Sequence, residues 1–182
     1  MAPPVRTSRQ LWIDTGLDLL ATEGPGAVRV EVLAQRLGVT RGGFYRQFGG
    51  RAELVDAMLD AWEQRSTDDV RRRVEAEGGD AAGKARKAGM LTFAPDLLPI
   101  DLAVREWARR DAKVAARLRR VDNRRMDYLR ELISTLSGDA GDVEARAMLA
   151  FSLVIGDHLI AADRLVGGRA RVLRDATRLI LG

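Results

Sequence analysis

The sequence predicts an all-α protein in which an N-terminal head of three short helices precedes a C-terminal helical bundle, with about nine helices in all. Three observations predict this class. Apolar residues recur with the 3.6-residue period of a helix in nearly every segment of the 182-residue chain. No segment shows the sustained alternation of apolar and polar residues, bounded by hairpin turns, that is typical of strands. Clusters of glycine and proline separate the periodic segments.

The expected elements follow these breaks. The first helix spans about 8–22 and ends at Glu23-Gly24-Pro25-Gly26, because glycine relieves the last helical turn and proline cannot continue it. Two short helices follow at about 30–37 and 41–47, with Thr40 as the capping residue of the second. Longer helices are expected at about 52–77, 81–93, 96–110, 113–136, 143–165 and 170–181.

The composition excludes many kinds of enzyme. The chain has no cysteine and one histidine, His158, so thiolate nucleophiles, cysteine zinc sites and sites with two histidine ligands are all ruled out. No nucleophile and base can be paired, and His158 is expected to be a packed or interfacial residue. We therefore predict that the protein is not an enzyme and holds no cofactor or metal.

Hydropathy predicts a cytoplasmic protein without membrane contact. No stretch reaches the ~20 apolar residues that a membrane-spanning helix needs. Residues 1–10 lack the apolar core of a signal peptide.

Basic charge is concentrated in two regions. The chain has a net charge of +4 and a pI near 10.1, and nearly all of its basic residues are arginines. Residues 26–51 carry a net charge of +4 and residues 105–130 a net charge of +6. Charge alone cannot choose between them as a nucleic-acid surface. We expect the second region to be a solvated helix flank whose arginines pair with carboxylates nearby in the same helix.

The segment from Val30 to Phe48 has the pattern of a helix-turn-helix. Two short helices with so brief a connection must cross steeply and share one core. Ala34 is the small residue at the expected close approach, and Gly38 lies in the turn, where a left-handed backbone costs glycine least. Val39 and Phe44 are expected to fill the space between the helices, with Phe48 below them. In such a motif the second helix enters the DNA major groove.

These residues also carry a resemblance to a known family. The run Leu33-Ala34-Gln35-Arg36-Leu37-Gly38-Val39-Thr40-Arg41-Gly42-Gly43-Phe44-Tyr45-Arg46-Gln47-Phe48 and the following Gly50-Arg51-Ala52-Glu53-Leu54 make residues 8–62 similar to the N-terminal domain of TetR-family transcriptional regulators. The resemblance covers about a third of the chain, and the rest is compatible with the family only in length and helicity. It implies a helix-turn-helix DNA-binding domain at 1–51, which we call the head, and a helical ligand-binding and dimerisation domain at 52–182, which we call the body.

The resemblance assigns DNA contacts that the chemistry of the residues supports. Arg41 opens the recognition helix, where a guanidinium can bind O6 and N7 of guanine. Tyr45 and Arg51 match phosphate-contacting positions of the family. Arg29 stands where the family usually has Ser or Thr, so we expect a weak cap there. The full set expected at DNA is Arg29, Thr40, Arg41, Gly42, Gly43, Tyr45, Arg46, Gln47 and Arg51.

The family implies a ligand site and a dimer interface for the body. A cavity between helices would bind a small hydrophobic effector, although the sequence cannot distinguish a cavity from a filled core. The residues expected to line it are Trp62, Met90, Phe93, Leu97, Trp107 and Met126. The two last helices are apolar and would form a homodimer that carries two heads to the half-sites of a palindromic operator. Effector binding would then release a repressor from double-stranded operator DNA.

Two alternatives remain open from the residues alone. The chain could be a helical-bundle enzyme or carrier in which the head is only a structural cap. It could also be an architectural protein that binds DNA without sequence preference and with a steep salt dependence.

Overall fold

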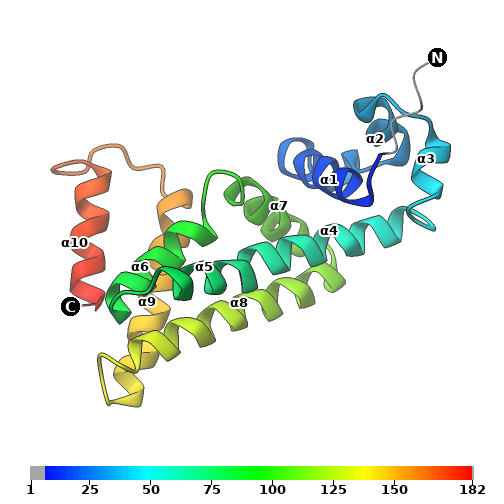
Figure 1. The fold of residues 1–182 in the computed structure, drawn as a ribbon. Helices are drawn as coiled ribbons and strands as arrows, with labels where there is room; N and C mark the ends of the chain where they lie inside the picture. Colours follow the sequence, from blue (N-terminus) through cyan, green and yellow to red (C-terminus); the bar gives the residue numbers. More distant parts are fainter. Residues whose placement is uncertain (1–6, 182) are drawn as a thin grey trace. The chain divides into compact units, whose positions relative to one another are not determined.

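The computed structural model describes residues 7–181 and confirms the all-α prediction (Figure 1). The regular secondary structure in this range is all helical, and no helix in it combines the length and apolarity needed to cross a membrane. The elements are α1 (Arg9–Glu23), the 3-10 turn η1 (Pro25–Ala27), α2 (Val30–Leu37), α3 (Arg41–Tyr45), α4 (Arg51–Ser66), α5 (Asp68–Glu77), α6 (Ala81–Thr92), α7 (Leu98–Ala108), α8 (Ala112–Ile133), α9 (Ala140–Leu159) and α10 (Arg169–Leu181).

The helix expected at 52–77 is divided into α4 and α5, which raises the number of α-helices in the described range to ten. Thr67 interrupts it with a non-helical backbone, φ −129° and ψ −76°. Just before it, the hydroxyl of Ser66 donates to the carbonyl of Trp62 at 2.7 Å, a local bond that competes with helix continuation. Asp68 and Asp69 then begin α5, where carboxylates favour the positive end of a helix.

The helix expected at 143–165 is also displaced, since α9 begins at Ala140 and ends at Leu159. Asp139 caps its first turn by accepting the N–H of Asp142 at 2.7 Å. After Leu159 the chain forms a connection in which Gly167 and Gly168 both have positive φ, a backbone that ends regular helix.

The described residues form two compact units, 7–66 with 95–120 and 67–94 with 121–181. The first contains α1 to α4, α7 and the first part of α8, and the second contains α5, α6, the rest of α8, α9 and α10. The functional boundary expected at residue 51 stays a prediction.

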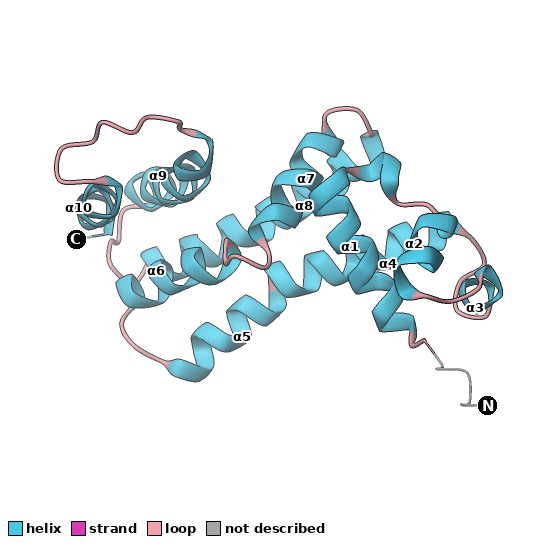
Figure 2. Ribbon diagram, turned by 90° about the horizontal axis from the view of Figure 1, so that it is seen from above, coloured by secondary structure: helices cyan, strands magenta, loops and turns pink. Residues whose placement is uncertain are grey.

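In the first unit α1 packs against α4 and α7, and the short helices α2 and α3 follow α1 (Figures 1 and 2). Trp12 of α1 is fully buried and meets Phe44 of α3 edge-on, with ring centroids 5.4 Å apart. Gly16 marks the close approach of α1 and α4, because a Cβ there would lie 2.6 Å from Sδ of Met58. The aromatic pair packs α1 against α3, and the small residue lets α1 pack closely against α4.

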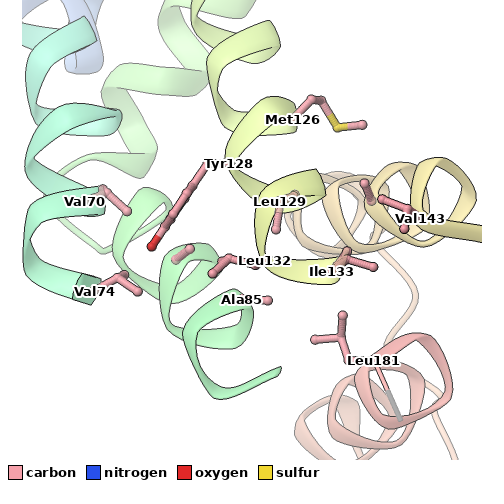
Figure 3. Close-up of a cluster of buried hydrophobic side chains, with 12 residues drawn as sticks. Val70, Val74, Ala85, Met126, Tyr128, Leu129, Leu132, Ile133, Val143 and Leu181 are labelled. Carbon is pink, nitrogen blue, oxygen red and sulfur yellow. The ribbon is translucent and has the colours of Figure 1, made fainter. Parts of the chain in front are cut away.

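The second unit has its own buried cluster, drawn in Figure 3. Val70 and Val74 of α5 face Tyr128 of α8, whose hydroxyl donates to Glu75 Oε1 at 2.7 Å. The guanidinium of Arg71 lies 4.8 Å from the Tyr128 ring centroid. Burial, together with the neighbouring Glu75 carboxylate, raises the pKa of Tyr128, so this phenol is a hydrogen-bond donor at neutral pH.

Candidate nucleic-acid interface

The turn between α2 and α3 has the geometry that the sequence predicts. Gly38 adopts a left-handed backbone, φ 66° and ψ 30°, and its N–H donates to the Gln35 carbonyl at 3.1 Å. The N–H of Val39 donates to the Ala34 carbonyl at 3.0 Å, which closes the end of α2. A side chain at position 38 would be strained by this positive φ, so glycine is required by the backbone.

The core beneath the turn is also confirmed. Ala34 is buried, and Phe44 and Phe48 are 0% and 2% exposed. Their rings lie 5.3 Å apart, and Phe44 also contacts Trp12. The apolar side of α3 is therefore fixed to α1, and the opposite side is available to a partner.

That opposite side carries the residues expected at DNA. Arg41, Gly42, Tyr45 and Arg46 are exposed, with Tyr45 at 61%. Gly43 is half-buried, and a Cβ there would lie 3.8 Å from the Trp12 ring. The bare backbone at two successive positions and the exposed cations leave a smooth, basic surface on α3.

The recognition helix is shorter than expected, since α3 ends at Tyr45 and not at Gln47. Arg46 and Gln47 lie in a turn in which the N–H of Gln47 donates to the Phe44 carbonyl at 2.8 Å. The Gln47 carbonyl accepts from Arg9 of α1, and its side-chain amide donates to the Thr7 carbonyl at 3.4 Å. These bonds stabilise Gln47 in the turn that follows α3.

Two predicted capping positions lack a side-chain cap. Thr40 and Arg29 occupy the residues before α3 and α2, but neither side chain bonds the helix N-terminus. The weak cap expected at Arg29 is thus confirmed. Thr40 occupies the N-cap position expected of it, but its hydroxyl takes no helix N–H. Both residues are exposed.

Glu31 of α2 is an acidic group that pairs with Arg41. Its carboxylate accepts from Arg41 Nη1 at 3.4 Å. A hydrogen bond from its own backbone N–H lowers the pKa of Glu31, and Arg41 and Arg29 lower it further. Glu31 is therefore ionised at neutral pH and pairs with Arg41 in the absence of DNA.

Arg51, expected at a DNA phosphate, also binds two backbone carbonyls of its own chain, which the sequence did not predict. Its Nε donates to the Val28 carbonyl at 2.5 Å and its Nη2 to the Pro25 carbonyl at 2.9 Å. The side chain thus joins the start of α4 to η1 and to the residue that follows it.

Arg9 is a further residue that the sequence analysis missed. Besides its bond to Gln47, its Nη2 pairs with Glu53 Oε1 at 3.0 Å, and its guanidinium lies 4.1 Å from the Phe48 ring centroid. Position 9 directly follows the α1 cap Ser8 and is exposed, so apolar periodicity gives it no signal.

The second basic region is a paired helix flank, as expected, and several of its arginines also pair with carboxylates of other helices. Arg117 and Arg120 of α8 both bind Glu63 of α4, the latter through Nε at 2.9 Å and Nη2 at 2.5 Å. Arg130 binds Glu144 of α9 in the same two-bond manner. Interhelical pairs of this kind leave the head as the better candidate for DNA.

The six residues expected to line an effector pocket are divided between the two units, three in each. Trp62 and Leu97 are buried and Trp107 half-buried in the first. Phe93 and Met126 are buried in the second, where Met90 is 75% exposed. A pocket stays a prediction, and Met90 lies at the surface of its unit.

The last two helices expose large apolar side chains. His158 is exposed, 5.9 Å from the Phe93 ring, and so it is not packed in the interior of this chain. The exposed apolar residues of α9, α10 and their connection include Met148, Leu149, Leu159, Ile160, Val166 and Leu179.

In comparisons with known proteins, the segment that contains the helix-turn-helix matches a protein family. Residues 13–58 match the bacterial regulatory proteins of the tetR family. The chain is 33% identical over 58 residues to the uncharacterized HTH-type transcriptional regulator TtgW of Pseudomonas putida. That match spans 32% of this chain and 43% of the relative, less than half of its length.

Solved structures resemble the whole chain. The TetR family transcriptional regulator PfmR from Thermus thermophilus aligns with a TM-score of 0.68 at 17% identity, over 96% of each chain. AibR in complex with isovaleryl coenzyme A and operator DNA aligns with a TM-score of 0.70 at 15% identity, over 95% of this chain and 97% of that chain. At such identities the similarity establishes the fold.

Proposed function

Through the domain at its N-terminus the chain belongs to the TetR family of bacterial regulatory proteins, and we propose that it is a transcriptional regulator that binds double-stranded operator DNA in a sequence-specific manner. The observation that carries the proposal is the exposed basic side of α3, whose other side is fixed by buried Phe44. A rigid, exposed helix with cationic and glycine positions suits the major groove.

The proposed contacts divide into base readers and phosphate binders. Arg41 reads guanine, and Gly42 and Gly43 allow the backbone of α3 to approach the base edges. Tyr45 binds phosphate from the exposed side of α3, and Arg46, in the turn that follows, binds either phosphate or a base edge. The remaining proposed contacts are Arg29, Thr40, Gln47 and Arg51. Gln47 and Arg51 must exchange or share their bonds to chain carbonyls in order to reach DNA.

We further propose that the protein is a homodimer formed through α9 and α10. Apolar side chains such as Leu149, at 55% exposed, and Leu179, at 87%, support this, because large exposed apolar residues gathered on two helices are typical of an interface. A two-fold dimer would present two α3 helices to the half-sites of a palindromic operator.

The proposed regulation is release of a repressor by a small hydrophobic effector in the cytoplasm. AibR, which has the same fold, binds isovaleryl coenzyme A and operator DNA in its crystal structure. An effector that binds one conformation of the body better than another would shift the dimer away from the spacing that fits DNA. The proposal assigns no catalysed reaction to the chain.

The test is a gel shift on the DNA that flanks the gene, with operator and scrambled competitors. The double variant Arg41→Ala with Tyr45→Phe should lose operator binding, at about 1–3 kcal/mol for the guanine contact alone. Arg72→Ala, at an exposed position of α5, is the matched arginine control and should bind as the wild type does. Equal competition by scrambled DNA would favour the architectural alternative. An intact biochemical activity in the double variant would favour the enzyme or carrier.

A further inference from the structure

We propose that Arg9 is a positioning residue for DNA recognition, which holds the C-terminal end of the recognition helix to α1 and α4; this inference rests on the proposed function. Arg9 belongs to α1 and lies outside α3 and the segments expected at DNA. Its effect on DNA binding would therefore be exerted through the orientation of α3.

The recognition helix cannot fix its own geometry. It has five residues, and two of them, Gly42 and Gly43, are poor helix formers. A helix this short is unstable without packing contacts. Its N-terminus lacks a side-chain cap. The direction of α3 must therefore be set by its buried aromatic side and by bonds at its ends.

The turn after α3 depends on contacts with its neighbours. It contains Gly49 and Gly50, which have more backbone freedom than other residues. Phe44 and Phe48 anchor the turn on its buried side. On its outer side the backbone depends on side chains that reach it from other helices.

Arg9 supplies that outer constraint at three points. Its Nη1 donates to the Gln47 carbonyl, its Nη2 pairs with Glu53 at 3.0 Å, and its Cζ lies 4.1 Å from the centroid of the Phe48 ring. The other oxygen of Glu53 accepts the N–H of Gly49 at 2.7 Å. One guanidinium therefore connects α1, the turn after α3 and the first turn of α4.

The electrostatics of Glu53 agree with this role. The Gly49 N–H, and after it the hydrogen bond from Arg9, lower the pKa of Glu53. The carboxylate is thus ionised at neutral pH and available to both partners. An ionised acceptor makes shorter and stronger bonds than a neutral one.

The geometry requires arginine and not only a positive charge. A guanidinium donates in several directions from one plane and stacks on an aromatic face at the same time. A lysine at position 9 could pair with Glu53, but one ammonium group could not also stack on Phe48 and bind the Gln47 carbonyl in the same way. The Lys variant therefore separates positioning from a direct contact between Arg9 and a DNA phosphate.

The experiment compares Arg9→Ala, Arg9→Lys and the control Gln10→Ala in the full chain. Gln10 is the next residue of the same helix, and its amide donates to Asp14 at 3.0 Å within α1. Dissociation constants for operator and scrambled duplexes are measured over a series of salt concentrations, and circular dichroism checks folding. Hydrogen exchange of the Gln47 to Gly50 amides is measured on the protein without DNA.

Both Arg9 variants should bind the operator about tenfold more weakly, with affinity for scrambled DNA and the salt slope unchanged. Amide exchange in the turn should be faster in both variants, and Gln10→Ala should match the wild type throughout. If Arg9→Lys binds like the wild type while Arg9→Ala weakens both duplexes and lowers the salt slope by about one, Arg9 is a phosphate contact and the inference is wrong.

The exchange data separate this inference from the proposed function. Unchanged exchange in both variants would overturn the positioning role, whatever the DNA results. A wild-type protein that does not prefer operator DNA would overturn the proposed function, while faster exchange in the variants would still support the contact network. If Arg9→Ala does not fold, the Lys variant decides the question.

Discussion

The Nε atom of Arg51 donates a hydrogen bond to the carbonyl oxygen of Val28 over 2.5 Å, across 23 positions of the chain. The same side chain reaches the Pro25 carbonyl at 2.9 Å. The first residue of α4 thus stabilises the turn that precedes α2. This residue has a structural role in the protein without DNA, in addition to the phosphate contact that we propose.

Arg51→Lys should separate these two roles. The lysine keeps a positive charge for phosphate but cannot make both carbonyl bonds, so we expect a loss of about 1–3 kcal/mol in the free energy of unfolding. Urea unfolding followed by circular dichroism measures this loss. A Lys variant as stable as the wild type would show that the carbonyl bonds contribute little.

The close approach of Gly16 and Met58 predicts a coupled pair of substitutions. Gly16→Val should destabilise the protein by about 1–3 kcal/mol, because its side chain would occupy the space of the Met58 thioether. Met58→Ala alone should also destabilise it, by leaving a cavity. In the double variant the valine partly fills that cavity, so the combined loss should be smaller than the sum. Additive losses in thermal unfolding would contradict the contact.

The ion pairs of Glu63 predict a dependence of stability on pH. The hydrogen bond from Arg120, and less strongly that from Arg117, lowers the pKa of Glu63 below its ordinary value of 4.5. A carboxyl with a depressed folded-state pKa contributes stability above its unfolded-state pKa and loses it as the pH falls through the folded-state value. Stability should therefore decline as the pH falls below about 4.5.

Glu63→Gln provides the comparison for this pH effect. It should be less stable than the wild type at pH 7, and the difference should shrink on acidification. Chemical unfolding at pH 7, 5 and 3.5 measures it. A difference that stays constant over this range would mean that the pairs with α8 contribute nothing to stability.

The exposed apolar residues of the last two helices predict the effect of a charge at the proposed dimer interface. Leu179→Glu should convert the dimer to a monomer, because a buried unpaired carboxylate is costly. Operator affinity should fall with it, since one head then binds alone. Sedimentation velocity measures the mass. The control is Leu136→Glu, at an exposed position between α8 and α9, and a Leu179→Glu variant that remains a dimer would place the interface elsewhere.

The sequence predicts the parts of the structure that depend on interactions between residues close together in the chain. The left-handed Gly38 and the buried Phe44 and Phe48 follow from turn chemistry and helical periodicity over fewer than twenty residues. The break at Thr67 was missed, because one Ser-Thr pair within a periodic run gives little signal against helix continuation.

The contacts that the sequence did not predict join residues far apart in the sequence. Arg9 and Gln47 are 38 residues apart, and Arg51 and Pro25 are 26 apart. An exposed arginine can pair with any of several carboxylates or carbonyls, and only the packing of α1 on α4 decides which. The same holds for Gly16, whose importance depends on a methionine in another helix.

The burial of Trp12 against Phe44 gives the chain an intrinsic optical reporter. The indole has no hydrogen-bond partner for its Nε1, and its ring meets that of Phe44 at an angle of 75°. Indole emission changes in colour and intensity with polarity and quenching, so any displacement of α3 would be recorded in the spectrum of Trp12. With the other two tryptophans replaced by phenylalanine, spectroscopy without any added dye could follow the motion of the recognition helix in real time.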